Sequence, residues 1–166
     1  MDITAFSDVY EVRLLREEDI PAVCALCEKN TLFYEYCPPF ASRDSIREDM
    51  HALPPGKTMR DKYYIGYFDA GKLIAVMDFI VGFPDAKTAF LGFFMTEASL
   101  QKKGLGSRII EDLCAYLSEV GFSSVRLGWV KGNPQAMHFW HKNGFRETGV
   151  SYDTEDYTVI VAQRQL

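Results

Sequence analysis

The sequence lacks any apolar run long enough to cross a membrane. Its longest strictly apolar stretches are Leu73–Met77 and Phe93–Met95, whereas a spanning helix needs about 20 such residues. Residues 1–8 contain no basic region followed by an apolar stretch, so we expect no secretory signal and a cytoplasmic location. No membrane partner is therefore expected.

The sequence also has no excess of positive charge. Its 18 Lys and Arg residues face 23 Asp and Glu residues, which leaves a net charge of −5. A chain of this charge is a poor general binder of phosphate backbones, so we expect no nucleic-acid partner. The 166 residues, 48% of them hydrophobic, contain no repeat, linker or low-complexity tract. We therefore predict a single domain over residues 1–166.

Cysteine is scarce, with four residues at positions 24, 27, 37 and 114. In a cytoplasmic chain this number predicts reduced thiols rather than a disulfide framework. Cys24 and Cys27 have the spacing of a redox pair, but such a pair normally opens a helix just after a strand. Here both fall in the middle of a predicted helix, which favours core thiols. A zinc site would need two more ligands at suitable spacing, so no metal is predicted.

What the sequence does contain is an alternation of strand-like and helix-like segments. β-rich runs predict strands over 11–15, 62–69, 72–82, 88–96, 124–130, 145–152 and 157–163. Helical spacing and stop signals predict helices over 17–29, 42–53, 104–121 and 133–142. The aromatic segment 32–41 contains Pro38-Pro39 and is predicted to be a loop. The order βααβββαβαββ predicts an α/β (α+β) sheet protein with helices packed on its faces.

The most informative segment is Gln101–Gly106, which lies between a predicted strand and the strongest predicted helix. Gly104 and Gly106 let the backbone approach a ligand without interference from a Cβ atom. The first N–H groups of the following helix then point at that ligand, and the helix dipole favours an anion. Lys102 and Lys103 add positive charge. These features predict phosphate or pyrophosphate binding, with a plain glycine turn and two solvated lysines as the alternative.

Two other phosphate-binding loops fit this segment less well. The P-loop of ATPases ends in Gly-Lys-Ser/Thr, but here Gly106 is followed by Ser107 and Arg108. The dinucleotide fingerprint Gly-x-Gly-x-x-Gly begins at Gly104 but meets Ile109 where its third glycine would stand. A nucleotide-dependent oxidoreductase is therefore a weak alternative.

Two motifs give the chain a family resemblance. Gln101-x-x-Gly104-x-Gly106 after an apolar strand resembles the acetyl-coenzyme A loop of the GCN5-related N-acetyltransferase (GNAT) superfamily, Gln/Arg-x-x-Gly-x-Gly/Ala. Residues 133–145 (NPQAMHFWHKNGF) resemble the family segment Asn-x-x-Ala-x-x-Phe/Leu-Tyr-x-x-x-Gly-Phe. The element order agrees along nearly the whole chain. The resemblance implies a GNAT-like fold, with a mixed central sheet of six to seven strands flanked by about four helices.

The resemblance also implies an activity. It points to an enzyme that transfers an acetyl group from acetyl-coenzyme A to a primary amine, which attacks the thioester directly and without a metal. The acceptor amine is unidentified, and both small molecules and peptides are possible acceptors. A homodimer is also possible. A non-catalytic coenzyme A-binding regulatory domain is the alternative.

The family's coenzyme site can be carried over onto this sequence. In the family two adjacent parallel strands splay apart around pantetheine, and here these are the strands near 94–96 and 127–130. The pyrophosphate lies on the amides of residues 102–107. The coenzyme-binding residues that the resemblance implies are Phe94, Met95, Thr96, Gln101, Lys102, Lys103, Gly104, Leu105, Gly106, Ser107, Asn133 and Trp140.

Position 140 departs from the family pattern. Trp140 stands where many members have a tyrosine that is often assigned to protonate the leaving thiolate. An indole N–H is only a donor, so Trp140 can pack or donate one hydrogen bond but cannot be that acid. The catalytic acid and base are therefore unassigned. The implied donor to the oxyanion is a backbone N–H near Phe94 or Met95.

Four further polar residues have both a structural and a functional interpretation. Asp78 interrupts an apolar strand, and we favour a solvent-exposed place on the sheet over one in the acceptor site. Glu97, just past the splayed strand, is expected to be a solvated loop residue rather than the catalytic base. Glu35, between two tyrosines, either lines a pocket for a cationic amine or belongs to a loop held by its aromatics. Asn133 is expected to cap a helix, which is compatible with coenzyme contact.

Overall fold

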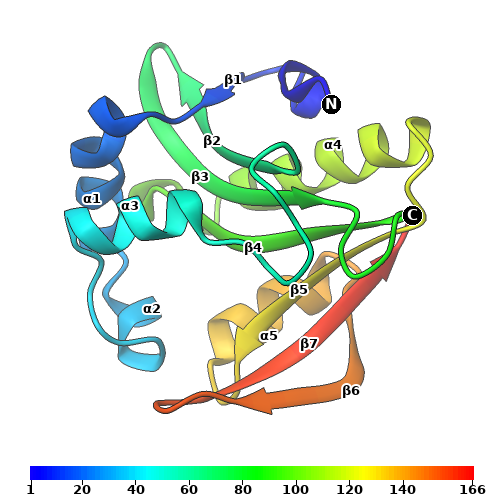
Figure 1. Cartoon of the computed structure of the whole chain (residues 1–166). Coiled ribbons are helices and arrows are strands. Elements are labelled where there is room, and N and C mark those ends of the chain that lie inside the picture. The colour runs from blue at the N-terminus through cyan, green and yellow to red at the C-terminus, as the bar shows by residue number, and fades with distance from the viewer.

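The computed structural model describes all 166 residues as one seven-stranded mixed sheet with helices on both faces (Figure 1). The strand order is β1-β2-β3-β4-β5-β7-β6. Every neighbouring pair is antiparallel except β4 and β5, which are parallel. The strands are β1 (Glu11–Leu14), β2 (Lys62–Asp69), β3 (Lys72–Val81), β4 (Thr88–Thr96), β5 (Ser124–Val130), β6 (Arg146–Asp153) and β7 (Thr158–Gln165).

Five α-helices cover the sheet, one more than the four expected. They are α1 (Ile20–Glu28), α2 (Thr31–Tyr36), α3 (Arg43–His51), α4 (Leu105–Glu119) and α5 (Pro134–Lys142). The additional helix is α2, so the expectation that segment 32–41 is entirely a loop was wrong. Its six residues span less than two turns, too few for apolar periodicity to distinguish a helix from a loop. None of the helices combines the length and apolarity needed to cross a bilayer.

The two faces of the sheet bury separate hydrophobic clusters. α1, α2 and α3 pack on one face, over a cluster that includes Tyr64 and Val76. α4 and α5 pack on the other face, over a larger cluster that includes Ile65 and Met77. Successive strand residues point to opposite faces, which is why neighbours in sequence join different clusters. In the following sections these faces are called the α1–α3 face and the α4–α5 face.

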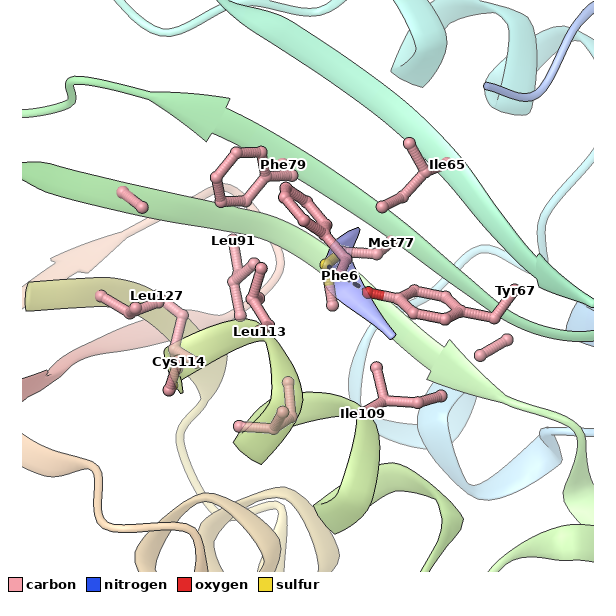
Figure 2. Packing of buried hydrophobic residues seen from close by; sticks show 14 of the residues in the cluster. Phe6, Ile65, Tyr67, Met77, Phe79, Leu91, Ile109, Leu113, Cys114 and Leu127 are labelled. Atoms are coloured by element: carbon pink, nitrogen blue, oxygen red, sulfur yellow. Dashed lines mark hydrogen bonds between the residues drawn. The ribbon is translucent and has the colours of Figure 1, made fainter. Parts of the chain in front are cut away.

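The larger cluster anchors α4 to the sheet (Figure 2). Leu113 and Ile109 of α4 are fully buried against Phe79 of β3 and Leu91 of β4, none of which is more than 3% exposed. Phe6, from the N-terminal 3-10 helix, packs edge-on against Phe79 with the ring centroids 5.0 Å apart. This packing fixes α4 and therefore also fixes the loop that enters it from the end of β4.

The cysteines lie mainly in these packed regions. Cys27 and Cys114 are buried, whereas Cys24 and Cys37 are half-buried, and all four are free thiols. Burial raises the pKa of both Cys27 and Cys114 to about 11, which keeps these thiols protonated near neutral pH. The interpretation of the Cys24–Cys27 pair as core thiols is thus confirmed for Cys27, while Cys24 retains partial exposure.

Candidate active site

β4 and β5 lie side by side for only part of their length. Their parallel pairing runs from Thr88–Ser124 to Leu91–Leu127, and no pairing joins the residues beyond. Both strands nevertheless continue, to Thr96 and Val130. Figure 1 shows the two strands diverging toward this end. β4 and β5 therefore splay apart in the middle of the sheet, as the family resemblance implied, and their unpaired ends beyond Leu91 and Leu127 are called the cleft in the following text.

A glycine follows the last paired residue in each of these strands. Gly92 and Gly128 are exposed although they belong to central strands, whereas Leu91 and Leu127 are 3% and 1% exposed. Gly92 is also the extra residue of a β-bulge, because the register between β3 and β4 skips it. The two glycines form the lips of the cleft. Neither glycine was expected to have this place, although the repeated Leu-Gly step in two adjacent strands was a signal for them.

Aromatic side chains fill the base of the cleft on the α4–α5 face. Trp140 of α5 is only 8% exposed, and its ring centroid lies 6.0 Å from that of Phe94 and 5.1 Å from that of Phe145. The indole N–H makes no hydrogen bond within the chain. Since no fully buried side-chain nitrogen lacks a partner, this N–H retains access to solvent. Trp140 is thus a packing residue at the cleft, with one free donor.

The loop that follows β4 presents a row of unpaired backbone amides. The N–H groups of residues 102–107 donate no hydrogen bond within the chain, and the first N–H of α4 to be satisfied is that of Arg108. Gly104 caps α4 in a left-handed conformation, with φ of 90°, and no side chain covers the helix end. Lys102 and Lys103 beside it are exposed. Unpaired amides, the positive end of the helix dipole and two lysines together favour an anionic ligand.

The two glycines of this loop have different tasks. A Cβ atom at Gly104 would meet nothing within 4 Å, so this position faces open space. A Cβ atom at Gly106 would lie 3.1 Å from the ring of Phe139, on α5. Gly106 therefore permits close packing of α4 against α5, whereas Gly104 supplies the backbone conformation at an open surface.

Other predicted coenzyme residues tie the loop to the fold. The side-chain amide of Gln101 donates to Asn30 at 2.6 Å and accepts from Gln135 at 3.2 Å. Asn133 caps α5 as expected, because its Oδ1 accepts from the N–H of Ala136 at 3.1 Å. Its Nδ2 has no partner within the chain. Gln101 thus has its contacts within the protein, while Asn133 retains one free donor.

Three further residues predicted to bind the coenzyme are largely buried. Met95 and Thr96 are 5% and 9% exposed, and Met95 belongs to the core on the α1–α3 face. Leu105, 8% exposed, belongs to the core on the other face, although its amide is free. Ser107, which is half-buried, adds another unpaired amide. The groups that Leu105 and Ser107 leave free for a ligand are therefore their backbone amides.

Two carboxylates are placed differently from the sequence expectation. Asp78 is 8% exposed and forms a 2.7 Å ion pair with Lys62, so the preference for a solvent-exposed Asp78 was wrong. Glu97 is 4% exposed and lies 3.3 Å from Lys29, so it is not a solvated loop residue. Both partners are distant in sequence, which is why single-sequence reasoning missed them. Glu35, in contrast, is exposed.

The α1–α3 face of the cleft holds a group of titratable side chains. Burial raises the pKa of Asp78, and the hydrogen bond from Lys62 partly opposes that effect. Asp49 of α3 is exposed as a whole residue, but partial desolvation of its carboxylate raises its pKa as well. Burial also raises the pKa values of Tyr34 and Tyr64, which keeps both phenols neutral. This face therefore combines aromatic surface with carboxylates, whereas the opposite side of the cleft carries the free amides.

Comparison with known families decides the class of this fold. The model of the acetyltransferase (GNAT) family matches residues 25–145. The chain belongs to the GNAT family. Members of this family are acyl-coenzyme A-dependent transferases, which agrees with the cleft and the free amides. A comparison with curated protein sequences finds no match.

Solved structures show the same fold in other GNAT proteins. An acetyltransferase from Thermus thermophilus is 19% identical, with a TM-score of 0.75 over 95% of this chain and 97% of the other. A Salmonella typhimurium acetyltransferase that modifies the N-terminal serine of ribosomal protein L7/L12 is 18% identical, with a TM-score of 0.73 and 97% coverage of both chains. The PaiA N-acetyltransferase of Thermoplasma acidophilum, in complex with coenzyme A, is 18% identical, with a TM-score of 0.68 over 95% and 99%.

Proposed function

We propose that this GNAT protein transfers an acetyl group from acetyl-coenzyme A to a primary amine by direct attack of the amine on the thioester. The observation that carries the proposal is the cleft between β4 and β5, which opens at Gly92 and Gly128 and leads to the six unpaired amides of residues 102–107. The cleft matches the extended pantetheine arm of acetyl-coenzyme A, and the amides match its pyrophosphate. The coenzyme A held by the related PaiA protein supports this choice of donor.

The chain's own groups divide the work of binding. The amides of residues 102–107 and the positive end of α4 would hold the pyrophosphate, with Lys102 and Lys103 adding longer-range attraction. The unpaired edge of β4 from Gly92 to Thr96 would receive the pantetheine amides, as a peptide adds to a sheet edge. Phe94 and Trp140 would pack against the arm, and the free Nδ2 of Asn133 would donate to it.

The amine would then approach from the α1–α3 face, because the coenzyme would occupy the side of the cleft next to α4 and α5. Attack by its nitrogen on the carbonyl carbon requires a neutral amine and a donor for the developing oxyanion. A backbone N–H of β4 near Phe94 or Met95 would be that donor. Trp140 cannot protonate the departing thiolate, so that proton would come from the amine or from solvent.

A non-catalytic coenzyme A-binding domain is the competing function. It has no support from the family, whose members are transferases. The two functions differ in whether the bound donor is consumed.

A binding and turnover experiment tests the proposal. Calorimetry with coenzyme A measures binding, and incubation with acetyl-coenzyme A and amines measures transfer by loss of the thioester. Propylamine, glycinamide, spermidine and a peptide with a free N-terminus would cover the main acceptor classes. The chain has four free cysteines, whose thiols would add background to a released-thiol assay, so loss of the thioester is the cleaner readout. Binding without transfer to any amine would favour the regulatory alternative, and absence of binding would reject both.

A further inference from the structure

The most unusual charged group beside the cleft is the ion pair of Asp78 and Lys62. The side chain of Lys62 on β2 is fully buried, and that of Asp78 on β3 is 11% exposed. Their Nζ and Oδ1 atoms are 2.7 Å apart. A buried ion pair seldom stabilises a fold more than apolar side chains of the same size would. Its presence in the sheet therefore suggests a role other than packing.

The ion pair uses only one oxygen of the Asp78 carboxylate. The other, Oδ2, lies over Gly92, so close that a Cβ atom there would be 2.5 Å from it. Oδ2 accepts no hydrogen bond within the chain, and no fully buried side-chain oxygen lacks a partner, so Oδ2 reaches solvent. Gly92 is exposed and marks the point where β4 stops pairing with β5, so Oδ2 lies beside the start of the cleft.

The surroundings of Asp78 supply few other charges. Lys62 and Tyr64 face it from β2, Asp49 acts on it from α3, and β4 contributes no titratable residue. Lys62 favours the ionised carboxylate, whereas Asp49 and burial disfavour it. Burial and Asp49 therefore increase the proton affinity of the Asp78 carboxylate, and the charge of Lys62 limits that increase.

We propose that Asp78 takes the proton from the incoming acceptor ammonium, directly or through one water, and that Lys62 positions its carboxylate. The proposal rests on the acetyl transfer proposed above. One ammonium proton passes to Asp78, and the nitrogen lone pair forms a bond to the carbonyl carbon. The carbon–sulfur bond breaks, the thiolate leaves with that electron pair, and the second nitrogen proton passes to the thiolate. Asp78 then returns its proton to solvent.

Two acceptors of similar shape separate this role from a structural one. Propylamine is almost fully protonated near neutral pH and needs a base, whereas 2,2,2-trifluoroethylamine is largely neutral and does not. Asp78→Asn should lower kcat/KM for propylamine by about 10²- to 10⁴-fold. For trifluoroethylamine the loss should stay below about tenfold, and the Kd for coenzyme A should be unchanged. Equal losses for both amines would show a structural role and overturn the proposal, as would an unchanged rate with propylamine.

Lys62 provides a second readout, which a purely structural pair would not produce. Its charge lowers the pKa of Asp78, so Lys62→Met should move the acidic limb of the kcat/KM profile to higher pH. An unmoved limb in a folded Lys62→Met variant would contradict the proposal. Should Asp78→Asn fail to fold because it leaves Lys62 buried and unpaired, the double variant Lys62→Met/Asp78→Asn removes both charges. It should show the same selective loss for propylamine.

The wild-type rates distinguish failure of this proposal from failure of the function on which it rests. Wild-type protein that transfers to no amine at any pH would reject the acetyl transfer and the role of Asp78 with it. Wild-type transfer to both amines, retained in full by Asp78→Asn, would reject the role of Asp78 alone.

Discussion

At one end of the β4–β5 pair the strands are hydrogen-bonded and buried, and at the other end the same strands separate and their glycines are exposed. In the closed end Ala89 and Val125 are fully buried, and the Thr88 and Ser124 hydroxyls lie 3.0 Å apart. In the open end the β-bulge at Gly92 changes the course of β4. The central strands therefore do not need to pair along their whole length. α4, held by the core, supports the fold where the pairing stops.

The aromatic base of the open end should give the largest effect. Trp140→Ala removes a ring that contacts Phe94 and Phe145, so the free energy of unfolding should fall by about 3–5 kcal/mol. Urea denaturation would measure it. A loss below about 1 kcal/mol would mean that Trp140 is not part of the core.

Conservative variants of the same residue test packing against chemistry. Trp140→Phe retains an aromatic surface and removes the donor, so turnover should stay within about tenfold, or ~1.4 kcal/mol of barrier. Trp140→Tyr restores the hydroxyl common in the family and should bring little or no gain. A folded Trp140→Phe protein that binds coenzyme A but is inactive would make the indole N–H part of the catalytic machinery.

The closed end should respond to truncation through stability alone. Val125→Ala leaves a small void in a fully buried site, which should cost about 2 kcal/mol in unfolding free energy. Because Val125 lies away from the open end, the Kd for coenzyme A should not change. A large change in Kd with unaltered stability would reverse the functional division between the two ends.

The loop at the open end can be tested with a matched pair of glycines. Gly104 and Gly56 both have positive φ, and a Cβ atom at either would meet nothing within 4 Å. Valine at either position should therefore impose a similar backbone strain, of about 1–2 kcal/mol. Only Gly104→Val should weaken coenzyme A binding, by at least about tenfold in calorimetry. Equal affinities in both variants would remove the loop from the binding site. Gly106→Val is a poorer probe because it also crowds Phe139.

The exposed lysines of the loop should give the smallest effect. Replacing Lys102 and Lys103 with alanine should raise the KM for acetyl-coenzyme A by a few-fold at low salt, and by less at high salt, because ions screen exposed charges. Steady-state kinetics at two ionic strengths would measure the difference. An unchanged KM at low salt would show that they are solvated surface residues without a role in binding.

Much of the fold followed from the sequence, and the reasons differ between elements. The bounds of β2, β4 and β5 agree with expectation, because β-rich runs ended by clear turn signals leave little choice. Helix α2 was missed because six aromatic-rich residues show no helical period. The loop with free amides at residues 102–107 was predicted because its glycine spacing, the start of the following helix and the family motif coincide there.

The acceptor side was much less visible in the sequence. The partner of Asp78 is 16 residues away, and that of Glu97 is 68 residues away. Whether such carboxylates are buried depends on strand register and helix placement, which no local pattern encodes. Gly92 and Gly128 at the opening of the cleft were also missed, because the Leu-Gly step in each strand becomes informative only when β4 and β5 are aligned.

Binding of coenzyme A in the cleft and at the free amides can be tested by titrating coenzyme A into isotopically labelled protein and following the amide signals by NMR. We expect saturable shifts at the amides of residues 102–107 and at Gly92 and Gly128, with the signal of Gly56 unmoved. These are the amides that the fold leaves unpaired, the two lips of the cleft and a distant reference. Shifts confined to the basic surface formed by His138, His141, Lys142 and Arg146, or no shifts at saturating coenzyme A, would contradict this expectation.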